Sequence, residues 1–125
     1  MTIMPTPGSE RRFHHRVSAI FPVTLSITAR GVTHGHETTA VDISQVAIQI
    51  SGNGDMIRQL MDQEFLPHTC DIVLRFPDAE APVSGNCQLI NYRRLSQHAY
   101  AIVLSLAAFS RKDLDFIKSW ITSQR

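Results

Sequence analysis

The chain has 125 residues, which suits a single domain and is enough to bury a hydrophobic core. Hydrophobic residues make up 43% of it and the formal net charge is +1, so neither disorder nor a nucleic-acid polymer as partner is indicated. No apolar run approaches the roughly 20 residues of a membrane helix, and the first ten residues lack a secretion-signal pattern, so we expect a cytoplasmic protein without membrane insertion.

Six runs of the sequence alternate between apolar and polar residues, with the period of two that is typical of half-buried β-strands. These predicted strands cover residues 21–28, 36–43, 47–51, 70–76, 82–92 and 98–106. Glycines predict turns over residues 29–35 and 52–54, and helical spacing over 55–61 predicts a helix of one or two turns. Prolines and polar residues over 1–9 predict a flexible tail, which leaves residues 10–125 as the domain.

One long helix is predicted at the C-terminal end, over residues 110–124. Ser110 and Asp113 have the spacing of a capping box, and Phe109 and Leu114 have that of a hydrophobic staple. The helix carries an apolar stripe, with Trp120 expected at its joint with the strands. Six strands followed by one helix argue against alternating β–α–β units. We therefore predict a mainly all-β fold, a six-stranded antiparallel β-barrel with the C-terminal helix packed on it.

A basic cluster precedes the first predicted strand, where Arg11, Arg12 and Arg16 surround His14 and His15. The guanidinium group is a planar fork of donors that matches two targets, a phosphate and the O6/N7 edge of guanine. On an extended arm Arg12 and Arg16 lie up to about 13 Å apart, far enough to hold two ends of one ligand. An isolated arginine cluster is more often simply solvated, so the cluster needs a second feature before it predicts a site.

Asp42 and Ser44 lie two residues apart at the end of a predicted strand, where the period of two would place them on the same face. A carboxylate can accept from the N1–H and N2–H₂ edge of guanine or orient an arginine, and a hydroxyl can bind a phosphate or a base. By themselves both would be ordinary turn residues. Together with the arginine cluster, they predict a site for a small, doubly anionic, guanine-bearing ligand.

The two segments resemble the motifs of the PilZ domain family, an RxxxR from Arg12 to Arg16 and a DxSxx(G) from Asp42 to Ala47. Arg11 corresponds to an arginine that often precedes the first motif, and the order of elements is similar over residues 10–125. The family implies a six-stranded barrel that binds the bacterial second messenger cyclic di-GMP. Its arginine arm wraps the ligand, while the second motif holds a guanine from the barrel surface.

The resemblance also implies a role for each matching residue. Arg12 and Arg16 would bind phosphate and guanine edges, Asp42 and Ser44 would bind a base edge, and Arg11 would help to hold an intercalated ligand dimer. We therefore expect a cyclic di-GMP receptor or adaptor of bacterial signalling, in motility or biofilm regulation, with a protein effector as partner. Neither enzyme activity nor a metal or other cofactor is expected, and the sequence does not predict the oligomeric state.

Ala47 stands where the family has glycine. If this position required a positive φ, a Cβ would cost roughly 1–2 kcal/mol, and each ~1.4 kcal/mol weakens binding about tenfold. If the glycine allowed the ligand to approach closely, the Ala47 methyl group could obstruct it. The departure favours an alternative, a PilZ-fold adaptor that binds a protein and no nucleotide.

Other features of the sequence give weaker candidates. Tyr92 could stack on a guanine and Arg93 could add charge, although a strand-end tyrosine that caps the core is at least as plausible. Ser44 lacks the surroundings of a catalytic nucleophile. An oligonucleotide-binding barrel is a third possibility, disfavoured by the near-neutral charge and the shortage of aromatic residues on strand faces.

Metal and redox chemistry are not indicated. Cys70 and Cys87 lie inside predicted strands and are expected to be buried free thiols. The histidines between residues 14 and 36 do not have the paired spacing of a structural zinc site. We expect His14 and His15 to titrate near neutral pH and to tune ligand affinity.

Overall fold

The computed structural model describes residues 16–124, so the predicted tail and the arginines Arg11 and Arg12 lie outside the described residues. Its strands are β1 (Val17–Ser18), β2 (Pro22–Ala29), β3 (Val32–Ile43), β4 (Ala47–Gly52), β5 (Thr69–Leu74), β6 (Val83–Arg94) and β7 (Tyr100–Ser105). Its helices are α2 (Gly54–Met61) and α3 (Arg111–Ser123). The predicted mainly-β class and the two predicted helices are thereby confirmed.

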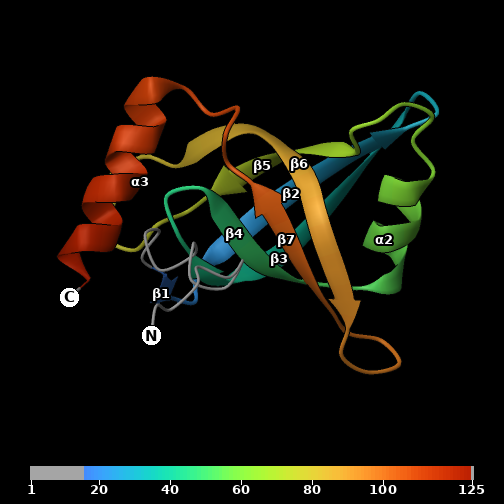
Figure 1. Cartoon of the computed structure of the whole chain (residues 1–125), viewed down its shortest axis with the longest axis horizontal. Helices are drawn as coiled ribbons and strands as arrows, with labels where there is room; N and C mark the ends of the chain where they lie inside the picture. The colour runs from blue at the N-terminus through green and yellow to red at the C-terminus, as the bar shows by residue number, and fades with distance from the viewer. Residues whose placement is uncertain (1–15, 125) are drawn as a thin grey trace, which may run out of the picture.

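Six antiparallel strands close into a barrel (Figure 1). They follow one another around it in the order β3, β2, β5, β6, β7, β4, and β4 pairs back with β3. Strand β1 lies outside this ring, because Val17 and Ser18 pair with Ile43 and Asp42 at the end of β3. The predicted six-stranded barrel is confirmed, with an additional strand that is too short to show an alternating pattern in the sequence.

The first hairpin is tighter than the sequence predicted. Only Arg30 and Gly31 separate β2 from β3, and both have a positive φ, of 50° and 78°. A two-residue turn of this kind matches the right-handed twist of the paired strands, so pairing begins at once with Ala29 opposite Val32. The prediction of a turn over residues 29–35 is therefore wrong for residues 32–35, which belong to β3.

The inward-facing side chains of the barrel form a continuous apolar core. Those with no exposed surface include Val23, Leu25, Ile27, Ile48, Ile50, Ile72, Leu74, Ile102 and Leu104. Cys70 and Cys87 lie opposite each other on β5 and β6, and both are buried and free, as predicted. Burial raises the pKa of the Cys70 thiol to about 12 and raises that of Cys87 as well.

Helix α3 covers one end of the barrel, while α2 lies at the other end (Figure 1). Ser110 caps α3 as predicted, because its Oγ accepts a hydrogen bond of 3.1 Å from the backbone N–H of Asp113. The ring of Trp120 lies 4.9 Å from that of Phe76 and 5.8 Å from that of Phe21, so it fills the joint between helix and barrel. Neither described helix is long and apolar enough to cross a membrane.

Candidate functional site

A one-residue bulge on β3 determines where Asp42 points. Ala40 and Ile43 are both fully buried, although an uninterrupted strand would turn them to opposite faces. The register of β3 against β4 shifts between Ala40 and Asp42, so Val41 is the extra residue. The bulge therefore turns Asp42 to the outer face of the barrel and keeps Ile43 in the core.

Arg16 lies beside Asp42 on this outer face. Its Nη1 is 3.9 Å from Oδ2 of Asp42, and it directly precedes β1, whose Ser18 pairs with Asp42. The distance is too long for a hydrogen bond, so the guanidinium donors of Arg16 are not committed to this carboxylate. The Arg16 side chain remains 46% exposed and can reach an anionic ligand while Asp42 orients it.

Ser44 is buried and shapes the turn between β3 and β4. Its Oγ accepts hydrogen bonds of 3.2 Å from the backbone N–H groups of Val46 and Ala47, and its own N–H donates to the Ala47 carbonyl at 2.8 Å. Ser44 follows the end of β3, so the prediction that it shares a strand face with Asp42 is wrong. The Ser44 hydroxyl therefore accepts the hydrogen bonds that hold this turn together. These bonds fix the backbone beside Arg16.

Ala47 is the first residue of β4 and has an ordinary backbone conformation. Among the described residues other than glycine, only Arg30 and Asp78 have a positive φ. Of the two reasons considered for a glycine at position 47, the requirement for a positive φ therefore does not apply. The other reason, obstruction of a ligand by the Ala47 methyl group, still applies, because Ala47 lines a pocket.

This pocket, of about 210 Å³, lies on the outer face of the barrel beside Arg16 and Ser44. Its lining residues are Arg16, Ser44, Val46, Ala47, Ile90, Asn91 and Val103. The pocket thus joins side chains from both sequence segments with side chains from β6 and β7. Its volume is below the roughly 300–1,000 Å³ of complete small-molecule sites, so it fits one base or one phosphate of a larger ligand.

A second bulge, on β6, supplies Asn91 to the pocket and removes Tyr92 from it. The register of β6 against β7 shifts between Leu89 and Asn91, so Ile90 is the extra residue. Beyond the bulge Asn91 pairs with the pocket residue Val103. Tyr92 pairs with the fully buried Ile102 and therefore lies on the opposite face of the strand from Asn91.

The structure therefore brings together some of the predicted ligand-binding residues and not others. Arg16, Ser44 and Ala47 line one pocket, with Asp42 next to Arg16. Tyr92 does not line this pocket, because its ring packs 6.1 Å from that of Tyr100 on the other face of the strand, and its role as a stacking partner stays a prediction. Asn91 was missed, since an unbroken alternation along β6 would have placed it inside the barrel.

Larger hollows elsewhere in the described chain contain none of the predicted site residues. A hollow of about 500 Å³ lies at the α2 end, lined by residues that include His34, Arg58 and Asp62, and it contains no predicted site residue. Within residues 16–124, no three His, Cys, Asp or Glu side chains gather as metal ligands would. His14 and His15 lie outside the described residues.

Comparison with known proteins gives matches by structure and none by sequence. No protein-family profile and no curated protein sequence matches the chain. The Bacillus subtilis inhibitor of motility MotI/DgrA superposes with a TM-score of 0.66 and 13% identity, over 97% of this chain and 56% of that one. The Borreliella burgdorferi PlzA protein, solved in complex with c-di-GMP, superposes with a TM-score of 0.53 and 12% identity, over 81% of this chain and 43% of that one.

The chain spans about half the length of these two proteins, and at 12–13% identity the likeness concerns the fold. The described residues superpose on a domain of each of these proteins, so the overall fold is shared. The described residues of this chain form a PilZ-type fold.

Proposed function

We propose that this chain is a cyclic di-GMP receptor domain that passes the signal to a protein partner. The observation that carries the proposal is the convergence of Arg16, Ser44 and Ala47 on one pocket. These residues come from two segments about 30 residues apart in the sequence, and each segment resembles a ligand-binding motif. PlzA, one of the proteins that share the fold, was solved with c-di-GMP bound.

The chemistry of the pocket suits part of a cyclic dinucleotide. Arg16 supplies a positive charge and several free donors for a phosphate or for the O6/N7 edge of guanine. Asp42 can orient that guanidinium, or accept from a guanine N1–H and N2–H₂ edge when Arg16 turns to a phosphate. Asn91 adds an amide on the opposite side of the pocket, and Ile90 and Val103 add apolar contacts for a base.

A pocket of about 210 Å³ cannot enclose a whole cyclic dinucleotide. We infer that Arg12, and Arg11 where a ligand dimer is bound, cover the remainder of the ligand from the arm that precedes β1. Binding would then hold this arm across the ligand, which changes the surface that a partner meets. Amide hydrogen exchange tests this step, and protection of residues 10–17 that stays unchanged at saturating ligand would contradict it.

Calorimetric titration of cyclic di-GMP tests the proposal directly. The wild-type chain should bind with micromolar or tighter affinity. Arg16→Ala should weaken binding at least about tenfold, because a charged hydrogen bond is worth roughly 1.5–3 kcal/mol, and the Arg12→Ala, Arg16→Ala double variant should abolish it. Arg111→Ala is the matched control, since this arginine is 89% exposed on α3 and does not line the pocket, and its loss should leave the affinity unchanged.

The second candidate is a nucleotide-free adaptor of the same fold, and one observation favours it. Ala47 presents a methyl group to the pocket where the related motif has only a hydrogen. If the folded wild-type chain gives no binding heat, this adaptor function replaces the receptor function. Titration of Ala47→Gly then decides whether the methyl group alone blocks the ligand.

A further inference from the structure

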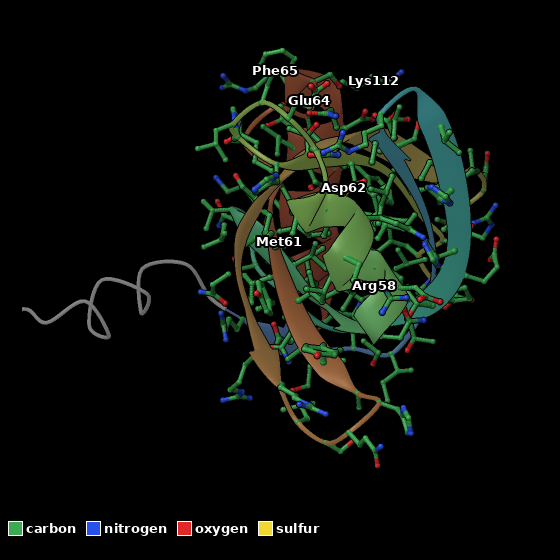
Figure 2. All side chains as sticks on the ribbon, turned by 90° about the vertical axis from the view of Figure 1, so that its right-hand side faces the viewer. Arg58, Met61, Asp62, Glu64, Phe65 and Lys112 are labelled. Carbon is green, nitrogen blue, oxygen red and sulfur yellow. The ribbon has the colours of Figure 1, made fainter. Side chains whose placement is uncertain are left out.

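The loop between α2 and β5 exposes two large apolar side chains in succession. Phe65 is 81% and Leu66 80% exposed, and among the described residues only Ile20 has an exposed apolar side chain to the same degree. Figure 2 shows Phe65 and its neighbour Glu64 together on this loop, beyond the end of α2. Adjacent apolar side chains that stay in water are unfavourable for an isolated molecule, so they point to a binding role.

Hydrogen bonds hold the two ends of this loop in place. The side chain of Gln63 donates to the backbone carbonyls of Thr28 and Thr69, at 3.0 and 2.6 Å, and accepts from the Thr69 N–H at 2.8 Å. On the other side of the exposed pair, the carbonyl of His68 accepts from the Leu89 N–H at 2.9 Å. Phe65 and Leu66 are therefore presented on a fixed base, which lowers the ordering cost when a partner binds.

Two acidic residues and one arginine lie beside the exposed pair, and Arg30 lines a hollow together with Glu64 and Phe65. Asp62 and Glu64 precede Phe65, and Asp62 accepts a hydrogen bond of 3.0 Å from Nε of Arg30. Glu64 forms no ion pair within residues 16–124. The two carboxylates outnumber Arg30, and this negative excess next to the apolar pair disfavours an anionic lipid surface or a nucleic acid and favours a protein groove with arginine or lysine at its rim.

We propose that Phe65 and Leu66 are anchor side chains that insert into an apolar, cation-rimmed groove of a second protein. The two side chains are almost fully exposed, so the partner supplies the apolar surface that buries them, and a few buried side chains of this kind can carry most of the binding energy of an interface. The proposal does not depend on nucleotide binding, because α2 and its loop lie at the opposite end of the barrel from β1 (Figure 1), the strand that directly follows Arg16.

A photo-crosslinking amino acid at position 66 of the full chain, expressed in its native cells, identifies the molecule that covers this loop. The same amino acid at position 20, which is as exposed but lies before β2, is the matched control. The expected result is one protein adduct from position 66 that position 20 does not give. Adducts only with lipid, only with a second copy of this chain, or with nothing discrete would overturn the proposal.

Affinity for the purified adduct protein then decides whether the two side chains are anchors. Phe65→Ser, Leu66→Ser should weaken binding at least about tenfold, whereas Ile20→Ser should leave it unchanged. Glu64→Lys, which keeps both apolar side chains, should weaken binding most at low salt, because it reverses the charge that faces the groove. Unchanged affinity in the double serine variant, with its thermal unfolding intact, would refute the anchoring role.

Discussion

The two halves of this barrel are built from similar strands and differ in regularity. Strands β2 and β5 keep one register along their whole paired length, and their inward residues alternate without interruption. Strands β3 and β6 each contain a one-residue bulge, at Val41 and Ile90, where they pair with β4 and β7. The regular half, β2 and β5, contributes side chains to the core and no candidate ligand residue. The bulged half, in which β3 and β6 pair with β4 and β7, forms the pocket.

The difference shows how a barrel obtains a binding face without losing its core. The two bulges flank the regular β4–β7 pair, and each one changes which side chains point outward from its strand. As a result Asp42 and Asn91 reach the outer face, while Ile43 stays on the inner one. Bulges beside binding sites commonly re-aim side chains in this way. The following experiments test this contrast between the regular and the bulged half.

The largest effect should come from the regular half. Leu25 has no exposed surface at the middle of β2, so Leu25→Ala should lower the free energy of unfolding by about 2–5 kcal/mol through lost burial and a residual cavity. Denaturant titration measures this loss. Where the variant is still folded, its affinity for cyclic di-GMP should equal that of the wild type, and a loss of affinity would show that the two halves are coupled.

The buried thiols of Cys70 on β5 and Cys87 on β6 should make stability depend on high pH. Burial raises the pKa of Cys70 from 9.0 to about 12 and raises that of Cys87 too, so the unfolded chain releases these protons first. The stabilising contribution is complete below pH 9 and is lost as pH rises from 9 towards 12, by about 1.4 kcal/mol per pH unit for each thiol.

Unfolding free energies of the wild type and of Cys70→Ala, Cys87→Ala between pH 8 and 11 measure this dependence. The wild type should lose stability more steeply than the double alanine variant. Equal slopes would mean that the thiols are not buried in the folded protein.

In the bulged half, removal of the Ser44 hydroxyl should destabilise the turn. Ser44→Ala leaves the N–H groups of Val46 and Ala47 without their acceptor, at an expected cost of about 1–3 kcal/mol in unfolding free energy. Thermal and denaturant unfolding measure this cost. If stability is unchanged while cyclic di-GMP binding is lost, then the hydroxyl serves the ligand rather than the turn.

Asn91 and Tyr92 test the bulge on β6 directly, because they are neighbours that face opposite sides. Asn91→Ala should weaken cyclic di-GMP binding about 3–10-fold, the effect of one hydrogen bond. Tyr92→Ala should leave the affinity unchanged, since this ring packs near Tyr100 on the other face. Calorimetry on both variants gives the comparison, and the reverse order of effects would place the bulge elsewhere.

The smallest change in stability is expected at Ala47. Because its φ is ordinary, Ala47→Gly should not relieve strain and should lower the unfolding free energy by roughly 0.5–1 kcal/mol through a more flexible unfolded chain. The affinity for cyclic di-GMP should rise as the pocket loses a methyl group. A gain in stability instead would show that position 47 is strained.

Much of the fold was predictable from local patterns. The alternation of Val23, Leu25 and Ile27 correctly placed β2, and the spacing of Ser110 and Asp113 correctly placed the start of α3. Period-two and capping signals depend on neighbours a few residues away, so they are visible in a single sequence. The segment that carries Arg16 and the segment that carries Asp42 and Ser44 were also recognisable from residue type and spacing, and their ligand remains a prediction.

The sequence by itself determined which residues alternate, where the long helix begins, and which charged residues accompany one another. Only the tertiary structure decided that the alternation is interrupted at Val41 and Ile90. The interruption at Ile90 is the reason that Asn91 faces the pocket and Tyr92 does not. It also decided that Ser44 closes a turn. The physical reason is that a bulge is fixed by pairing with a strand distant in sequence, and one extra residue exchanges the two faces of everything that follows.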